Sequence, residues 1–151
     1  MRHFGPVPGI APGTLFDSRA ALSVARIHRP RIAGISGSAL DGADSIVISG
    51  GYEDDRDEGD TLIYTGHGGN DRITRRQIAD QELRYSNAAL VKSCQQRLPV
   101  RVTRGASVRS RFSPPFGYRY DGIYNIEEYW SETGKSGYLV WRFLLARAED
   151  A

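Results

Sequence analysis

Glycine and proline interrupt this chain so often that it has room for few long helices. The 151 residues include 17 glycines and 7 prolines, residue types that favour turns. Between them stand short runs rich in β-branched and aromatic residues, a pattern typical of strands. The length suits one domain with a buried core, so we expect a single, mainly β domain over residues 1–151.

Local patterns predict the order of the elements. A helix is expected over residues 15–27, with Asp17 or Ser18 as its N-cap, and a second over residues 77–94. Strands are expected over residues 45–52, 60–66, 99–105, 118–130 and 138–147. Because strands outnumber helices, the predicted class is α+β, mainly β, with a curved, open, barrel-like sheet and a few flanking helices.

Residues 53–60 concentrate negative charge in a chain that is slightly basic. Six of these eight positions are Asp or Glu, whereas the net charge of the protein is +2. Like charges this close repel one another, so an ordinary surface turn rarely collects them. A calcium loop of the EF-hand type is one explanation, but no starting position gives the required order of oxygen ligands and glycine. We therefore expect no metal site here.

The residues beside the acidic run favour a pocket for a planar group. Tyr52 and Tyr64 flank the run, and two facing aromatic rings can hold a flat ligand. The Gly50–Gly51 backbone is open to close approach, and Asp55 can accept a hydrogen bond from an amino group. Together these groups complement the edge of a cytosine. The spacing leaves open the alternative that the two tyrosines only pack within strands.

The usual catalytic patterns are missing from the sequence. His3, His28 and His67 form no metal-ligand motif, and Cys94 falls in an apolar helical run, where packing is its ordinary role. "GHGG" lacks the Lys-Ser/Thr of a phosphate-binding P-loop, and "SGGY" lacks the frame of a hydrolase elbow. We therefore predict a binding protein rather than an enzyme, with no cofactor.

Positive charge gathers in residues 72–119. This segment has ten arginines and Lys92 against Asp80 and Glu82, a local balance of +9. A planar guanidinium can bind phosphate with two hydrogen bonds or stack on a base. The segment is therefore either a nucleic-acid surface or a solvated face that aids solubility, and the residues alone leave both open.

Motifs along nearly the whole chain resemble the SRA domain, also called the YDG domain after the signature found here as Tyr120, Asp121 and Gly122. The motifs run in order through "FGPVPG", "HRPRIAGI", "SGGYEDDRDEGDTLIYTGHGGND", "DQEL", "PVRV", "RYDGIYNIEEYW" and "VWRFLLAR". The resemblance implies an SRA/PUA-like fold. It also implies that the partner is double-stranded DNA with a modified cytosine.

Members of this family flip a modified cytosine, usually 5-methylcytosine, out of the duplex and into a concave pocket. The resemblance implies that Tyr52 and Tyr64 sandwich the base and that Asp55 accepts from its amino group. The other pocket positions that it implies are Ser49, Gly50, Gly51, Thr65 and His67. Vertebrate members have serine in place of His67, beside the methyl group. The other carboxylates of the run are then expected to fix the turn or to hold arginines.

The resemblance also assigns two loops that reach into the DNA. In "RPRIAGI", Ile32 fills the gap left by the flipped base and Arg31 contacts the backbone; a return of Ile32 into the core is the alternative. In "NDRITRRQ", a shorter loop than in vertebrate members, the tip is Arg75, Arg76 and Gln77.

In bacteria, compact SRA domains are often joined to an HNH nuclease in modification-dependent restriction enzymes. We therefore expect the recognition domain of such a system, with any nuclease in a fused segment or a partner. No membrane segment is predicted, and the expected location is the bacterial cytoplasm, at the nucleoid, or otherwise a nucleus. The alternatives are selectivity for 5-hydroxymethylcytosine, binding of the DNA backbone alone, and an enzyme that uses Asp55 and Glu53 on the flipped base.

Overall fold

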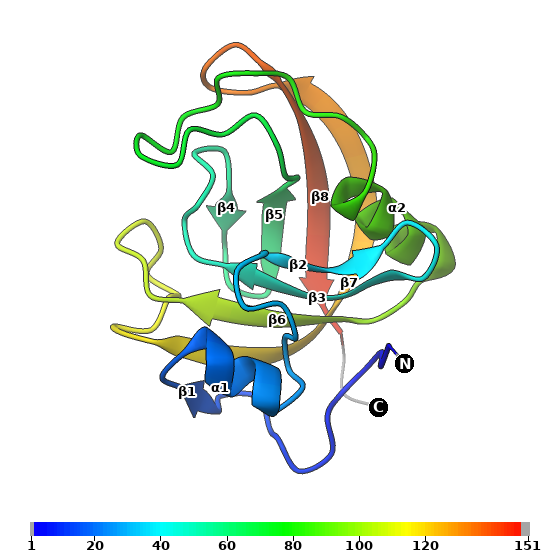
Figure 1. The fold of residues 1–151 in the computed structure, drawn as a ribbon, viewed down its shortest axis with the longest axis vertical. Helices are drawn as coiled ribbons and strands as arrows, with labels where there is room; N and C mark the ends of the chain where they lie inside the picture. The colour runs from blue at the N-terminus through cyan, green and yellow to red at the C-terminus, as the bar shows by residue number, and fades with distance from the viewer. Residues whose placement is uncertain (1, 149–151) are drawn as a thin grey trace.

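The computed structural model describes residues 2–148, and a strongly curved sheet dominates it (Figure 1). The strands are β1 (Leu15–Phe16), β2 (Ile35–Ser38), β3 (Gly42–Ile48), β4 (Arg56–Asp57), β5 (Thr61–Thr65), β6 (Val100–Gly105), β7 (Tyr118–Thr133) and β8 (Leu139–Arg147). Their order in the sheet is β2-β3-β6-β7-β8-β5-β4, and β1 pairs with β7. The edge strands β2 and β4 do not pair with each other, so the predicted open, barrel-like sheet is confirmed.

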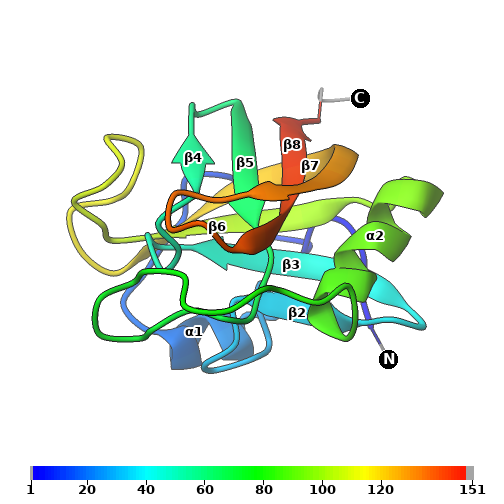
Figure 2. The same ribbon diagram turned by 90° about the horizontal axis from the view of Figure 1, so that it is seen from above.

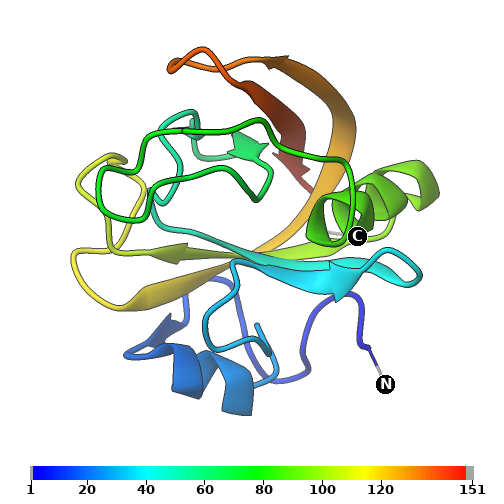
Figure 3. The same ribbon diagram turned by 45° about the horizontal axis from the view of Figure 1, so that its top comes forward.

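The sheet curves because its longest strand bends. β7 pairs with β6 along its first part and with β8 along most of its length, and the register with β8 shifts between Ile126 and Glu128. Such irregularities bend a strand and increase its twist. All pairs are antiparallel except β3 with β6. The bend carries β8, β5 and β4 round to face β2 and β3 (Figure 3).

Two helices cover the sheet at different places (Figure 2). α1 (Arg19–Val24) has Ser18 as its N-cap, whose side chain accepts from the Ala21 N–H, and it buries Leu22 against Ile27 and Tyr120. α2 (Ser86–Gln96) buries Leu90 in the larger cluster inside the curved sheet. Within residues 2–148, neither helix has the length and apolar character needed to cross a membrane.

The structure corrects the predicted elements at several points. The second helix begins at Ser86 instead of residue 77, because Gln77 and Gln81 turn inward to bind loop carbonyls and Tyr85 adopts a positive φ of 54°. β1, β2 and β4 were not predicted, since they are short. The strands on either side of the acidic run do not pair: β3 lies between β2 and β6, whereas β5 lies between β4 and β8.

The acidic run is held by a buried arginine. Arg104 is 2% exposed and donates to both carboxylate oxygens of Asp57 at 2.7 and 2.8 Å. It also donates to the Gly59 carbonyl at 2.8 Å and to Asp121 at 2.8 Å. Burial alone would raise the pKa of Asp57, but the hydrogen bonds and charge of Arg104, together with hydrogen bonds from the Gly59 N–H and Ser110, outweigh it and the pKa falls below its usual range. Arg104 thus ties the acidic run to the aspartate of the Tyr-Asp-Gly signature.

Most other carboxylates of the run also have partners. Asp60 pairs with Arg147 at 2.8 Å, and Glu58 pairs with Arg56 at 3.1 Å. Glu53 and Asp54 accept backbone N–H groups, from Gln77 at 2.7 Å and from Lys135 at 2.9 Å. These bonds join the run to three distant parts of the chain. The expectation that its carboxylates fix the turn and hold arginines is therefore met.

The balance of +9 in residues 72–119 does not describe one surface. Arg101 is 1% exposed and donates to the carbonyls of His3, Gly5 and Ile27. Together with Arg104, it stands inside the protein. These guanidinium groups hold the fold and cannot contact a polyanion. The charge balance of residues 72–119 therefore overestimates the basic surface that this segment provides.

Replacement of Arg104 should destabilise the whole domain. In Arg104→Lys the charge remains, but the ammonium has three N–H donors on one nitrogen and cannot replace the two bonds to Asp57 together with those to Asp121 and the Gly59 carbonyl. We expect a loss of about 1–3 kcal/mol in the free energy of unfolding for the buried acceptors left unpaired. Urea unfolding measures it. The matched control is Arg111→Lys, an exposed position, which should stay within about 0.5 kcal/mol of wild type; equal stability of the two variants would contradict the role of Arg104.

Candidate functional site

A cavity of about 620 Å³ opens where β3 and β5 end. Residues of the loops 28–34 and 66–77 also line it. Its walls include the predicted residues Ser49, Gly51, Tyr52, Asp55, Tyr64 and His67. Two predicted residues lie elsewhere: Gly50 faces Ser107 and Arg109, and Thr65 is fully buried. The cavity therefore unites residues from two strands that do not pair.

Three aromatic rings form one side of the cavity. The ring stacked on Tyr52 is His67, with centroids 5.7 Å apart and planes 16° from parallel. The Tyr64 ring is tilted by 45° to the same imidazole at 6.4 Å. The Tyr52 hydroxyl accepts from the Gly68 N–H at 3.0 Å, whereas the Tyr64 hydroxyl donates to the Val47 carbonyl at 3.3 Å. His67 thus takes the stacking position on Tyr52 that the resemblance gives to a base.

Asp55 supplies the carboxylate of the cavity. Its Oδ1 accepts from the Thr65 N–H at 2.7 Å. Burial raises its pKa to about 7, although the Thr65 hydrogen bond and the charge of Arg142 act in the opposite direction. Burial also lowers the pKa of His67 to about 4. At neutral pH the cavity therefore holds a neutral imidazole beside a carboxyl group that is close to its titration point.

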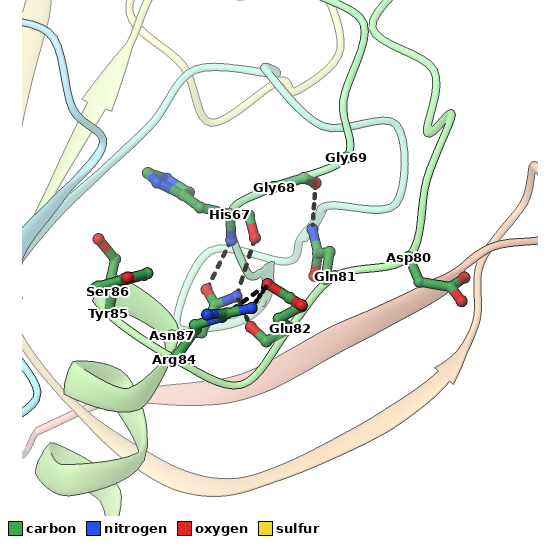
Figure 4. A pocket seen from close by; sticks show the side chains of 10 residues that line it. All are labelled: His67, Gly68, Gly69, Asp80, Gln81, Glu82, Arg84, Tyr85, Ser86 and Asn87. Atoms are coloured by element: carbon green, nitrogen blue, oxygen red, sulfur yellow. Dashed lines mark hydrogen bonds and ion pairs between the residues drawn. The ribbon is translucent and has the colours of Figure 1, made fainter.

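Buried amides hold the segment that carries His67 (Figure 4). Asn87 brackets the His67 backbone: its Oδ1 accepts from the His67 N–H at 2.7 Å and its Nδ2 donates to the His67 carbonyl at 2.9 Å. Gln81 donates to the Gly66 carbonyl, and Gln77 donates to the Gly68 carbonyl. The imidazole points away from these amides (Figure 4). These residues were not predicted from the sequence, because isolated amides give no pattern until the chain is folded.

Arg19 and His28 shape the loop 28–34. Arg19, on α1, donates to the carbonyls of Pro30 at 2.9 Å and Ile32 at 3.1 Å. The buried His28 ring bonds to the Ala33 carbonyl at 2.8 Å and to the Ser45 hydroxyl at 2.6 Å. With its carbonyls held from inside, the loop leaves the Ile32 side chain 85% exposed. The alternative that Ile32 returns to the core is thereby excluded.

The loop 70–77 has its own internal supports. The Asp71 carboxylate accepts from the N–H groups of Ile73 and Thr74 at 2.8 and 3.1 Å. Asn70 Nδ2 joins the loop to the Gly51 carbonyl at 3.0 Å. Arg75 and Arg76 are exposed as predicted, and so is Ile73. Gln77 was predicted at the tip but is only 2% exposed, because its amide is used inside, against the carbonyls of Gly68 and Ala79.

The arginines fall into two groups by their partners. Ion pairs with carboxylates hold Arg2, Arg56, Arg84, Arg101, Arg104, Arg119, Arg142 and Arg147. Among residues 2–148, the structure gives no such pair to Arg31, Arg72, Arg75 or Arg76, all exposed near the cavity. Other exposed arginines without such a pair in this range, Arg26, Arg97, Arg109 and Arg111, do not line this cavity. In the same described part, no three His, Cys, Asp or Glu side chains gather as a metal site.

The sequence is similar to curated proteins over nearly its full length. It is 45% identical over 169 residues to the E3 ubiquitin-protein ligase UHRF1 of Danio rerio, and the alignment covers 98% of this chain and 22% of that protein. It is 42% identical over 161 residues to a UHRF1-like protein of Cryptococcus neoformans, covering 99% of this chain and 47% of that one. The chain thus spans less than half the length of these relatives.

Solved structures share the fold. The modification-dependent TagI restriction endonuclease is 46% identical, with a TM-score of 0.91 over 97% of this chain and 53% of its own. The SUVH5 SRA domain bound to fully hydroxymethylated CG DNA is 42% identical, with a TM-score of 0.84 over 99% of this chain and 96% of its own. A sequence model of the SAD/SRA domain matches residues 3–151. The chain belongs to the SAD/SRA domain family.

Proposed function

We propose that this domain binds double-stranded DNA and holds a modified cytosine, flipped out of the duplex, in the cavity of Tyr52, Asp55 and Tyr64. One observation carries the proposal: a carboxylate, tyrosine rings and a bare glycine backbone meet in a single cavity bordered by unpaired arginines. Family membership supports it, since the SUVH5 SRA domain is described as bound to fully hydroxymethylated CG DNA and TagI as a modification-dependent restriction endonuclease.

Each group in the cavity has a role toward a cytosine. The base stacks on the Tyr52 and Tyr64 rings, and the Asp55 carboxylate accepts from its N4 amino group, the edge that cytosine presents as a donor. The Gly51 backbone approaches the base without a side chain. Because His67 is stacked on Tyr52, the imidazole shifts when the base enters. Its new position sets the room left beside C5, so His67 bears on the choice among cytosine, 5-methylcytosine and 5-hydroxymethylcytosine.

The exposed Ile32 offsets part of the cost of flipping. Taking a base out of the stack costs a few kcal/mol, and an apolar side chain that enters the gap restores contacts with the neighbouring base pairs. Ile32 is presented for this role by Arg19, which fixes the carbonyls on either side of it. Arg31 and the arginines of loop 70–77 then neutralise phosphates.

The chain offers recognition rather than cleavage, so we place any catalytic step in the wider protein. A role as the recognition domain of a restriction system, with a fused or partner nuclease of the HNH type, is one form of the proposal. A reader domain within a larger eukaryotic protein such as the UHRF1 relatives is the other. Binding of the DNA backbone alone is the competing function, which the unpaired arginines would also support.

Asp55→Ala should weaken binding to modified DNA far more than to unmodified DNA. Titrations use identical duplexes with cytosine, 5-methylcytosine or 5-hydroxymethylcytosine at one position and at one salt concentration. Loss of the acceptor for a buried amino group costs about 1–3 kcal/mol, or roughly 5- to 150-fold in Kd. The control is Asp60→Ala, in the same acidic run but outside the cavity. If wild type shows no preference among the duplexes, backbone binding replaces base reading.

Binding to the modified duplex should weaken as the pH falls below 7. In the unbound protein the pKa of Asp55 is about 7. The amino group of the bound base favours the ionised carboxylate. Below pH 7, Asp55 must therefore lose a proton when the base binds. Kd should rise by up to about tenfold per pH unit between about pH 7 and pH 5.5. Residual binding by Asp55→Asn should lack this dependence. Tighter binding at low pH would show instead that a protonated Asp55 donates to the base.

Ile32→Ala should impair flipping without harm to the fold. An exposed substitution changes stability by about 0.5 kcal/mol at most, whereas a core isoleucine would cost about 2–5 kcal/mol. We expect weaker binding to the modified duplex and a smaller rise in fluorescence from 2-aminopurine placed beside the modified base. Leu40→Ala, equally exposed in the turn between β2 and β3, is the control. A large drop in melting temperature, or flipping at the wild-type level, would remove Ile32 from the mechanism.

A further inference from the structure

The loop between β6 and β7, residues 106–117, has no role in the site described so far. It leaves the sheet beside the cavity and is closed at its neck by the Ala106 N–H, which donates to the Gly117 carbonyl at 2.9 Å. It projects from the same end of the sheet as loop 66–77, opposite α2 (Figure 2). Two of its side chains, Val108 and Phe116, are apolar and exposed.

Inward contacts give this loop a fixed shape. The Ser110 hydroxyl donates to Asp57 at 3.2 Å, and the Phe112 ring stands against Gly59, where an added Cβ would lie 2.9 Å from it. Arg119 donates to the Phe112 carbonyl. The loop therefore rests on the acidic run that also forms the cavity wall. A loop held in this way loses little conformational entropy when it binds a partner.

Its outward side chains are basic and unpaired. Arg109 and Arg111 are exposed, and residues 106–117 contain no Asp or Glu. In the part of the chain that the structure describes, neither arginine has a carboxylate within ion-pair distance. Arg109 uses one nitrogen on the Tyr52 carbonyl at 3.3 Å, and Arg111 lies over the Phe112 ring at 4.9 Å. Most of their N–H donors remain available.

Arg109 and Arg75 lie beside two consecutive glycines, Gly50, which faces away from the cavity, and Gly51, which lines it. An added Cβ on Gly50 would lie 3.2 Å from Cδ of Arg109, and one on Gly51 would lie 3.5 Å from Nη1 of Arg75. The two guanidinium groups thus belong to one basic rim, although they come from different loops. A duplex whose base enters the cavity brings its phosphates along this rim.

We propose that loop 106–117 is a third DNA-contacting loop, in which Arg109 and Arg111 bind backbone phosphates on one side of the modified cytosine. This inference rests on the proposed function, since it takes the duplex as partner. The contact adds affinity but no base selectivity, because phosphates carry no sequence information. It extends the footprint beyond the base pairs that loops 28–34 and 70–77 enclose.

The test is a salt titration of the Arg109→Ala/Arg111→Ala double variant on modified and unmodified duplexes. Loss of two phosphate contacts should lower the slope of log K against log salt by about two units and reduce affinity several-fold on both duplexes. Arg111→Ala alone, which leaves the Tyr52 contact intact, should lower it by about one unit. Arg109→Lys/Arg111→Lys keeps the charges and should keep the slope. Arg97→Ala, exposed at the far end of α2, should have no effect.

A second experiment varies the length of the duplex. Trimming the base pairs on one side of the modified cytosine should abolish the difference between wild type and the double variant, whereas trimming the other side should preserve it. An unchanged salt slope with a wild-type preference for modified DNA would overturn the third contact alone. A lowered slope in a protein that does not distinguish the duplexes would uphold the contact and overturn base reading.

Discussion

The rest of the structure depends on the hydrogen bonds that the buried guanidinium of Arg104 donates. A buried cation is expensive unless every donor finds an acceptor, and here Asp57, Asp121 and the Gly59 carbonyl fill that need. These acceptors come from β4, β7 and the turn before β5, so one side chain fixes three parts of the curved sheet. Of the carboxylates that repel one another in the extended chain, Arg104 neutralises Asp57, and the wall that carries Tyr52 and Asp55 acquires a defined position.

Some residues of the site hold the backbone of its loops, and others are left in position to contact a ligand. Arg19, His28, Asn87 and Gln81 are used up in bonds to loop carbonyls and N–H groups, and they leave Ile32 and the His67 ring in defined places. Arginine serves both purposes: Arg19 and Arg104 hold loops and strands through carbonyls and carboxylates, whereas Arg75 is exposed at the cavity. A scaffold prepared in this way spends little binding energy on ordering its loops.

The sequence predicted what depends on neighbours along the chain. β-branched runs located β3, β5, β6, β7 and β8, and Ser18, one of the two predicted N-caps, precedes α1, which is shorter than the predicted helix over residues 15–27. It could not predict which strands pair, so β3 and β5 were expected to flank a corner although neither lies beside the other. Gln77 was placed at a loop tip and Arg101 on a basic surface for the same reason: burial depends on what folds over a residue. Cavity membership was predicted for Tyr52, Asp55 and Tyr64 through family motifs, whereas the supporting amides have no such signal.

The parallel pairing of β3 with β6 has a consequence for how this domain can vary. Residues 49–99 form the long connection between these two strands, and they include the acidic run, the cavity wall and loop 70–77. Closing a longer connection costs only about 0.6 kcal/mol for each doubling of its length. Insertions and deletions in its loops, outside β4, β5 and α2, therefore leave the sheet register almost untouched. Loop length, and with it the target that the loops reach, can therefore change during evolution at little cost to folding. The same change is open to protein engineering.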